Sequence, residues 1–462
     1  MTNNIKSEIK GKLILQAKIS NTSPMLIASG KGDVIDFEVI KDYSGNPIIP
    51  AAGFAGMLLN SFNDLDKTKK SQLVIENQNY FWGCNTLGNE SQSHIIIDDL
   101  KIEGTCKIVE RDGVSIDRES NLGGDGRKFD YELIEPGATF KLNAEITLRN
   151  DFDTNTFLQF LYFIAQKGRN GEYQQGAFKS SGFGILNWSD IKIFTFDFKA
   201  NEGAKWFEYL KSKGETKGLT NIYNDNECAL ELNKREILTI QGKFALKNSL
   251  IIRSDGDQTD ADIKAPDKTH LKNEAGVALL TGKSLKGAIR HRAYKILNTI
   301  GHSNSEGFID DLFGFVNEKS KKAELSRMKS FETEVKHADQ MQIQPRIKID
   351  RFTGGTIEHA LMQSQPLWHK NETVLLKFEI KNCKEEEAAL MLLVMKDLFN
   401  EDLPIGGEKA IGRGLLTGSE LTVSGSISGM SFDLKFDKSG IIDKTKINIA
   451  NDLVSKLNPQ TA

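Results

Sequence analysis

The clearest periodic pattern in the chain is an apolar stripe within residues 279–300. Apolar side chains recur there at steps of four or seven residues, at Leu285, Ile289, Ile296 and Ile300. This spacing places them on one face of a helix. The preceding residues read as the end of an apolar strand that turns at Gly282, and Ser284 is the predicted N-cap. The stretch therefore predicts a strand followed by a helix with one buried face.

Positive charge gathers at the start of the same predicted helix, on Lys283, Lys286, Arg290 and Arg292. Cations at a helix N-terminus oppose the helix dipole, which favours anions there. Two interpretations are open for the stretch alone. The cations either bind an external polyanion or form a solvated basic face.

The chain contains this stretch twice, because residues 48–60 form a first copy. Landmarks pair in one order and at a nearly constant offset: Gly56 with Gly287, residues 81–83 with 312–314, 116–118 with 349–351, 176–184 with 406–414, and Asp36 with Asp260. Agreement of this kind predicts an internal duplication, so the function has to explain why two units are joined.

The duplication predicts two domains, over residues 1–200 and 239–435. Residues 201–238 are expected to be a linker and residues 436–462 a C-terminal tail. Each unit reads as strand, helix, hairpin, helix and strand. This order suits an α+β protein built from two split βαβ units of the ferredoxin-like type.

Local patterns place the main elements of each unit. In the first unit they predict a strand at 12–20, a hairpin within 114–133 and a helix at 157–165. In the second they predict a strand at 241–252 and a helix at 388–399. A short helix is expected near 206–210 in the linker, and the tail either forms a short helix at 450–457 or frays.

Composition excludes several classes of protein. The 60 basic and 63 acidic residues give a net charge of −3, so any positive surface for a nucleic acid has to be local. The first twelve residues lack the apolar segment of a signal peptide, and the run 388–395 is too short to span a bilayer. Four widely spaced cysteines argue against a zinc site and indicate free thiols. We expect a cytoplasmic protein.

Several of these segments together resemble one family. They are Thr-Gly-Lys-Ser-Leu-Lys-Gly-Ala-Ile-Arg at 281–290, the Phe-Gly or Trp-Gly pairs, the two Ile-Asp-Arg segments and the Gly-Arg-Gly loop at 412–414. In this order, found twice, they are similar to the RAMP superfamily, and within it to backbone subunits of type III CRISPR effector complexes. The chain resembles a tandem fusion of two such subunits.

The resemblance implies two RRM-like domains, each with a protruding β-hairpin called the thumb. The thumbs would lie near residues 103–140 and 330–373. In such complexes backbone subunits stack along a guide crRNA, and the thumbs kink guide and target RNA at regular intervals. The implied partners are the crRNA, a complementary target RNA and other backbone subunits, with no membrane.

The resemblance also implies a site of target cleavage in each copy. A flipped target nucleotide is cut beside an aspartate in the loop after the first strand, which matches Asp36 and Asp260. The register of the second loop is open, because Asp257 and Asp262 lie beside Asp260. The first copy departs from the family at its helix, where Gly53 and Leu59 stand in place of Ser284 and Arg290.

The chemistry of cleavage can be argued from RNA itself. The 2′-hydroxyl is a built-in nucleophile, so a protein has only to align it with the adjacent phosphate and stabilise charge. One carboxylate can act as base, orient the hydroxyl, or hold a divalent cation, so Mg²⁺ or Mn²⁺ is expected. The sequence shows no compact His–Cys or His–Asp–Ser group. His291 and His359 have no counterparts in the first copy and are interpreted as surface or RNA-stacking residues.

Binding of the guide would rest on its phosphates. Backbone N–H groups at glycine turns and helix N-termini can hold them, and lysine or arginine adds charge without reading sequence. The candidates are Gly53, Gly56, Arg118, Lys179, Ser180, Lys283, Ser284, Lys286, Gly287, Arg290, Arg292, Arg351, Lys409 and Arg413. The alternative for the two glycine loops is a tight helix-to-strand turn.

Three functions follow from this reading. The first is a guide-binding backbone subunit that is also an endoribonuclease, cutting target RNA with one or both aspartates in antiviral defence. The second is an architectural RNA-binding subunit without catalysis. The third, a stand-alone ribonuclease that processes guide RNA, is disfavoured because a duplicated unit suits a filament better than one cut. The sequence leaves open the filament position, the guide length and the partner subunits.

Overall fold

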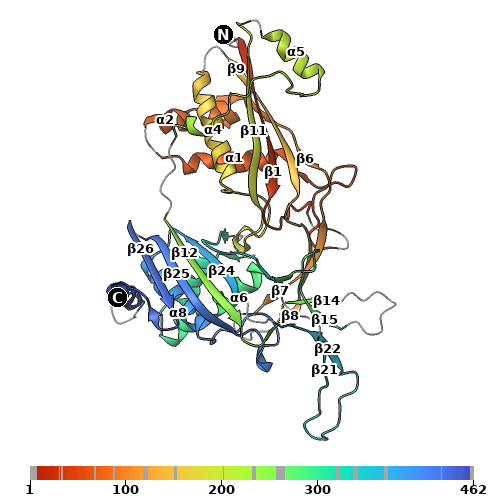
Figure 1. Ribbon diagram of the computed structural model, residues 1–462, viewed down its shortest axis with the longest axis vertical. Helices are drawn as coiled ribbons and strands as arrows, with labels where there is room; N and C mark the ends of the chain where they lie inside the picture. The colour runs from red at the N-terminus through yellow and green to blue at the C-terminus, as the bar shows by residue number, and fades with distance from the viewer. Residues whose placement is uncertain are drawn as a thin grey trace. The chain divides into compact units, whose positions relative to one another are not determined.

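A computed structural model describes residues 8–30, 32, 35–66, 69–86, 89–117, 123–149, 153–200, 202–230, 236–255, 266–317, 320, 322–336, 342–368, 373–427 and 429–457. The chain divides into two compact units (Figure 1). Unit 1 consists of residues 1–110, 131–179 and 183–234, and unit 2 of residues 111–130, 180–182 and 235–462. Asp260 and Arg118 lie outside the described residues.

Unit 1 is built on an antiparallel sheet whose central strand is β1 (Ile9–Asn21). Leu13, Leu15 and Ile19 point from β1 to the inner face and are fully buried. The strand order is β10 (Tyr173–Gln174), β11 (Ile185–Asp197), β1, β9 (Thr139–Arg149), β6 (Leu100–Glu103) and β2 (Ile48–Ile49), with β5 (Ile95–Ile97) on β9.

The helices of unit 1 supply an aromatic core beside this sheet (Figure 1). They are α1 (Ala51–Leu59), η1 (Asn60–Asp64), α2 (Lys69–Glu76), α3 (Gln78–Trp82) and α4 (Thr154–Arg169). Asp153 caps α4 by accepting from the Thr156 N–H at 3.0 Å. Phe81 of α3 stacks on Phe160 of α4 with ring centroids 5.2 Å apart, and both rings are fully buried.

Unit 2 repeats the plan. Its sheet has the order β19 (Met328–Ser330), β24 (Thr373–Lys381), β12 (Ile237–Leu246), β25 (Leu416–Ile427), β26 (Met430–Asp437) and β27 (Gly440–Ile441). Its helices are α6 (Gly282–Thr299), α7 (Ser305–Phe313), α8 (Glu385–Phe399), η5 (Lys444–Lys446) and α9 (Ile447–Ser455). In both units the first strand lies between the strands that precede and follow the second long helix. This confirms two tandem ferredoxin-like domains in an α+β protein.

Each sequence repeat contains a β-hairpin. The first is β7 (Ile108–Ile116) with β8 (Gly123–Ile134), and its residues 111–130 belong to unit 2. The second begins as a ladder in a sheet of the order β14 (Arg253–Asp255), β15 (Lys268–His270), β22 (Met362–Gln365) and β21 (Gln344–Arg346). Residues 347–361 extend from that ladder as an exposed loop (Figure 1).

Short ladders and single turns complete the described structure. The strand pairs are β3 (Cys84–Thr86) with β4 (Asn89–Ser91), β13 (Ser249–Leu250) with β23 (Leu367–Trp368), β16 (Ala278–Leu280) with β20 (Thr333–Val335), and β17 (Phe315–Asn317) with β18 (Lys322–Glu324). The 3₁₀ turns are η2 (Lys179–Ser181), η3 (Asp225–Glu227) and η4 (Lys409–Ile411).

Residues between the two repeats fold onto the outer face of the first sheet, which is the face opposite its inner core. Helix α5 (Gly203–Lys211) is the short helix expected near 206–210. Its Trp206 and Tyr209 are buried against Ile14 of β1 and Phe196 of β11. Most of the segment predicted as a linker is therefore part of unit 1.

The structure also tests the other local predictions. The helices expected at 157–165, 388–399 and 450–457 are present as α4, α8 and α9. The predicted cap of α6 is wrong: Thr281 is the N-cap, and its Oγ1 accepts from the Ser284 N–H at 3.3 Å. Because β16 ends at Leu280, the helix starts before the serine can cap it. The first strand of unit 2 starts at Ile237, four residues earlier than predicted.

Candidate RNA interface

Asp36 lies in a loop that is anchored to the base of the first hairpin. The loop closes on itself where the Ser29 N–H donates to the Glu38 carbonyl at 3.0 Å. The Glu132 N–H of β8 donates to the Phe37 carbonyl at 2.9 Å, and the Glu132 carboxylate accepts from the loop in return. Asp36 is half-buried beside these bonds. The backbone around this carboxylate is therefore tied to the strand that leads out of the hairpin.

The first glycine loop packs against the segment that leads into the Asp36 loop. The Gly184 N–H donates to the Pro24 carbonyl at 2.8 Å, and the Ala177 N–H donates to the Leu26 carbonyl at 2.7 Å. Gly176 has φ 88°, and an added Cβ would lie 2.1 Å from the Leu26 oxygen. These glycines are required by the close approach of two chain segments, which supports the alternative of a tight turn.

The second glycine loop has the same architecture. The Gly414 N–H donates to the Ser249 carbonyl at 2.7 Å, and the Gly407 N–H donates to the Ile251 carbonyl at 2.8 Å. Lys179 of the first loop is exposed, whereas Lys409 of the second is half-buried and burial lowers its pKa. The two loops keep one backbone path and present different charge to solvent.

Two helix glycines behave differently. Gly56 of α1 and Gly287 of α6 pair in the duplication, and both are exposed. An added Cβ at either position would meet no atom within 4 Å. In contrast, a Cβ at Gly53 would lie 2.9 Å from Nε2 of Gln175. Glycine inside a helix is less stable than alanine by about 0.5–1 kcal/mol, and nothing in the described structure requires it at these two positions.

Protein groups already occupy the N-termini of both helices. The Ala51 N–H at the start of α1 donates to the Asp99 carboxylate at 2.7 Å. At the start of α6, Thr281 and Gly282 are buried, and a Cβ on Gly282 would lie 2.3 Å from the Ser181 carbonyl oxygen. The expected phosphate positions at these two helix starts are thus filled by the chain itself.

Two of the four cations of α6 form ion pairs within unit 2. Arg290 Nη2 lies 3.0 Å from Asp310 of α7, and Arg292 Nε lies 2.6 Å from Asp397 of α8. Lys286 is half-buried, and burial together with the charge of Arg290 lowers its pKa to about 8. The prediction that all four face RNA did not anticipate these pairs, because the acids that bind the arginines are distant in sequence.

Lys283 lies beneath the first hairpin within unit 2. Its Nζ is 5.2 Å from the ring centroid of Phe129. Beside it, Arg111 of β7 forms a bidentate pair with Glu332, at 2.7 and 3.3 Å, and its side chain is only 3% exposed. Burial, together with the charge of Arg111, lowers the pKa of Lys283 to about 6. Lys283 and Arg111 thus help to bind this hairpin to α6 and its neighbours.

Arg413 is also engaged inside unit 2. Its side chain is 3% exposed, its Nε donates to Glu408 at 2.8 Å, and its Nη2 donates to Gln344 at 2.6 Å. Arg346 binds the same Glu408 carboxylate, and Arg253 approaches it at 3.8 Å. Arg413 was a candidate because of its Gly-Arg-Gly sequence. That sequence does not show that Glu408, in the preceding turn, binds the arginine.

Three further residues named from the sequence are Ser180, Arg351 and His359. Ser180 is half-buried in η2, and Arg351 is exposed at the end of the second hairpin. His359 is exposed, with φ 58°. The second acidic loop lies between β14 and β15, in the range 256–265 that the structure does not describe.

Within the described ranges, no three His, Cys, Asp or Glu side chains come together in a way that could hold a metal ion. His270, which the sequence did not single out, is buried, and its pKa is lowered to about 4, mainly by burial. Its Nδ1 lies 3.2 Å from the Ile252 N–H and its Nε2 lies 3.0 Å from the Leu279 carbonyl. Nδ1 also lies 3.3 Å from the Leu250 carbonyl. All three of these contacts are to backbone groups, so the role of His270 is structural.

The features that sequence reasoning missed are two largely buried acids that bind cations, Glu332 and Glu408, and the hairpin residue Arg111. Glu332 lies far from Arg111 in the chain, so their pairing has no local signal, whereas Glu408 is close to Arg413 in sequence and is brought to it by the turn between them. In the part of the chain that the structure describes, no helix has both the length and the apolar character needed to cross a membrane. The four cysteines are free, as expected.

A family model of the RAMP superfamily matches residues 18–187 and again residues 243–417. The two matches cover most of the chain and coincide with the two ferredoxin-like domains. The chain belongs to the RAMP superfamily and contains its domain twice. Membership indicates a CRISPR-associated role in RNA binding. A comparison with curated proteins finds no match.

Proposed function

We propose that this protein is a crRNA-binding backbone subunit of a type III CRISPR effector complex and that it cleaves target RNA. The observation that carries the proposal is the pair Gly56 and Gly287. Both are exposed glycines inside a helix, at equivalent positions of the two RAMP domains, with open space where a Cβ would be. Such positions allow an RNA backbone to approach the helix closely. Two equivalent positions provide two contacts along one strand.

Positive side chains elsewhere in the two domains would add further contacts to the guide. Lys179 and Arg351 are exposed, and Lys286 is one residue from Gly287. Lysine and arginine bind phosphates without reading base sequence, and base pairing between guide and target then supplies specificity. Arg118, outside the described residues, remains a candidate by its place in the first hairpin.

Other backbone subunits are the proposed protein partners. The exposed loop of the second hairpin carries Phe352, which is 99% exposed, together with Ile347 and Ile349, each more than half exposed. The corresponding hairpin of the first repeat packs its Phe129 and Arg111 within unit 2. Exposed apolar side chains gathered on one arm are typical of a surface that another protein covers.

Asp36 is the proposed catalytic residue of the first domain. Its half-buried carboxylate can accept the proton of a target 2′-hydroxyl as the oxygen attacks the adjacent phosphate and the 5′-oxygen leaves. A loop carboxylate that is only half-buried also suits Mg²⁺, or Mn²⁺, which keeps several waters and binds substrate phosphates. Such an ion would stabilise the charge that develops on the phosphate. Asp260 is proposed for the same role in the second domain.

Mapping target-RNA products with the assembled complex tests this proposal. Asp36→Ala should remove one product and Asp260→Ala another, while guide binding persists, because a carboxylate beside a polyanion adds no attraction. The upstream products should end in a 2′,3′-cyclic phosphate. Glu38→Gln, two residues away in the same loop, is the matched control and should retain every product.

Other outcomes of the same mapping favour the alternatives. An Asp36→Ala complex that cuts at every wild-type position would leave only an architectural role for the first domain. Specific cutting of a guide precursor by the purified chain alone would favour the processing ribonuclease.

A further inference from the structure

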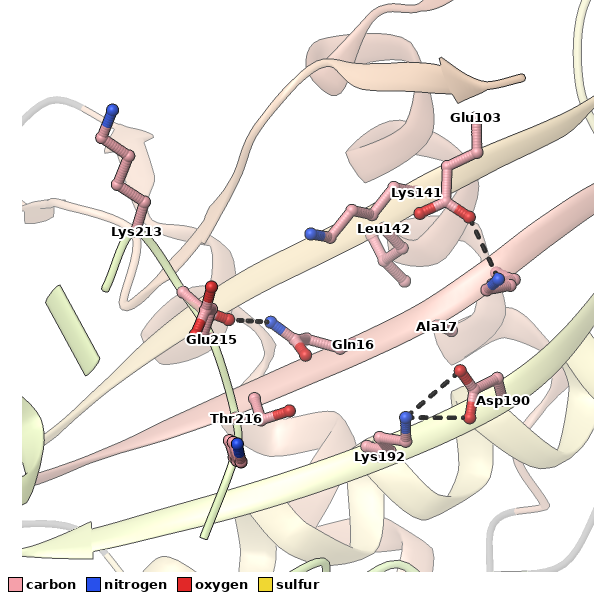
Figure 2. A pocket seen from close by; sticks show the side chains of 13 residues that line it. Gln16, Ala17, Glu103, Lys141, Leu142, Asp190, Lys192, Lys213, Glu215 and Thr216 are labelled. Atoms are coloured by element: carbon pink, nitrogen blue, oxygen red, sulfur yellow. Dashed lines mark hydrogen bonds and ion pairs between the residues drawn. The ribbon is translucent and has the colours of Figure 1, made fainter. Parts of the chain in front are cut away.

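A cavity of about 380 Å³ lies on the outer face of the first sheet (Figure 2). Its floor is formed by β1, β9 and β11, and its roof by residues 213–217, which follow α5. Five lysines and three carboxylates line it: Lys18, Lys141, Lys192, Lys213 and Lys217, with Glu103, Asp190 and Glu215. All of these residues belong to unit 1. The candidate residues for guide binding and cleavage lie elsewhere in the chain.

The charges in the cavity are unevenly paired. Lys18 lies 3.3 Å from Glu103, and Lys192 lies 3.0 Å from Asp190. The remaining lysines, Lys141, Lys213 and Lys217, face one further carboxylate, so the lining as a whole is positive. Such a surface attracts anions.

The roof is held in place by hydrogen bonds and by a helix C-cap. Gln16 of β1 donates to the Gly214 carbonyl at 3.3 Å, and Tyr209 of α5 donates to Asn143 of β9 at 3.3 Å. At the end of α5 the Gly214 N–H bonds to the Tyr209 carbonyl at 2.9 Å, which is the Schellman pattern. The cavity is therefore built by the fold and is not a gap between loose side chains.

Two residues that line the cavity adopt backbone conformations that L-residues disfavour. Lys213 has φ 55° at the position of the C-cap that glycine usually occupies. Asp190 has φ 49° at a bulge, where the register between β1 and β11 shifts between Gln16 and Lys18. Strained residues of this kind cluster at functional sites.

The positions of the lysines indicate how large the ligand is. Lys141 extends along the floor toward the roof, whereas Lys213 stands at the rim with its amine directed outward (Figure 2). Two amines that point in different directions favour a ligand with more than one phosphate over a single small anion. None of the described lining residues is aromatic, so the cavity offers no ring for base stacking.

We propose that this cavity binds consecutive phosphates of an RNA strand through Lys141, Lys213 and Lys217, as an additional contact on the outer face of unit 1. The choice of RNA rests on the proposed function. A free phosphate compound, such as pyrophosphate, shares the same chemistry and is the other source to be distinguished.

The test uses the full-length protein and the variant Lys141→Gln/Lys213→Gln/Lys217→Gln. Binding of oligouridylate and of inorganic pyrophosphate is measured across a salt series. The triple variant should bind RNA at least tenfold more weakly, and its salt slope should fall by about 0.7 for each phosphate that the lysines no longer neutralise. Lys199→Gln/Lys205→Gln/Lys211→Gln removes equal charge from the same unit outside the cavity and should retain the wild-type slope.

A second variant separates binding from structure. Lys213→Gly relieves the left-handed backbone conformation and should raise the Tm while weakening RNA binding. A higher Tm with unchanged RNA binding would assign Lys213 a structural role only and overturn its part in the proposal.

Comparison of the two ligands separates the failure of this proposal from failure of the proposed function. Equal RNA affinity for the triple variant and wild type, in a protein that binds RNA, would overturn the cavity site alone. Lysine-dependent binding of pyrophosphate by a protein that binds no RNA would overturn both RNA as the ligand and the proposed function.

Discussion

The two RAMP domains share a strand order but stabilise it in different ways. In unit 1 the part of the outer sheet face beneath α5 is apolar and covered, with Ile14 and Phe196 buried against Trp206. The same face of β12 in unit 2 carries Thr239 and Gln241 and is partly exposed. A sheet that is covered on both faces has apolar residues on both sides of its strands. In a sheet with one open face, apolar and polar residues alternate along each strand. A fold can thus keep its inner core while its outer face is adapted independently.

The helices show a second contrast. In unit 1, Phe54 of α1 stacks on Trp188 of β11 with ring centroids 5.8 Å apart. In unit 2, α6 is tied to its neighbours by the ion pair of Arg292 with Asp397, and the hairpin beside it by Arg111 with Glu332. Aromatic packing dominates the first set of contacts, and buried ion pairs contribute much of the second.

The largest effect is expected from breaking a buried ion pair of unit 2. Arg111→Ala leaves the largely buried Glu332 carboxylate without its bidentate partner, and loss of one member of a buried pair typically costs about 3–5 kcal/mol. Urea unfolding of the full chain measures the loss. Lys205→Ala, which breaks the exposed pair with Glu202, is the control and should cost less than about 1 kcal/mol. Equal losses for the two variants would contradict the role given to burial.

The next largest loss of stability is expected from removing Trp206, which covers the outer sheet face of unit 1. Trp206 is 8% exposed and packs on Phe196 with ring centroids 5.2 Å apart. Trp206→Ala should lower the free energy of unfolding by about 3 kcal/mol, near the low end for buried tryptophan because α5 lies at the surface of the unit. Phe207→Ala, on the exposed side of the same helix, should be nearly neutral. A nearly neutral Trp206→Ala would mean that the outer face does not depend on its cover.

The ionic contacts of unit 2 also predict a pH dependence. The pKa of Lys283 is lowered to about 6 from its ordinary value of 10.5, so between these values the unfolded chain binds more protons than the folded one. The contribution of Lys283 to the free energy of unfolding therefore rises as the pH increases across that window. Between about pH 6 and about pH 9, the free energy of unfolding of the wild type should increase relative to that of Lys283→Met as the pH rises. Parallel pH profiles would contradict the burial of this amine.

Much of this architecture could be predicted because it depends on local periodicity. The stripe of Leu285 and Ile289 identified α6, and both side chains are fully buried. The run Leu13-Ile14-Leu15 is buried throughout and carries a further signal, since three consecutive apolar residues in a strand indicate two covered faces. The duplication then fixed which segments correspond.

The candidate site could be predicted only in part. Sequence spacing identifies Arg290 and Arg413 as cations, but their partners Asp310 and Glu408 are brought to them by the fold. Charge alone does not distinguish an arginine that meets RNA from one that binds a buried carboxylate. Gly56 and Gly287 can be singled out from the sequence, because they occupy aligned positions of the two repeats.

The most direct test of guide binding substitutes these two glycines. Gly56→Ala and Gly287→Ala should each raise the free energy of unfolding by about 0.5–1 kcal/mol, because alanine is the better helix former and the space beyond each Cα is open. Gly203→Ala at the start of α5, where the space is also open, is the control and should leave RNA affinity unchanged. The measurement is crRNA affinity of the double variant Gly56→Ala/Gly287→Ala beside its unfolding curve. A more stable protein that binds crRNA more weakly is the predicted result, and a more stable protein with wild-type affinity would contradict it.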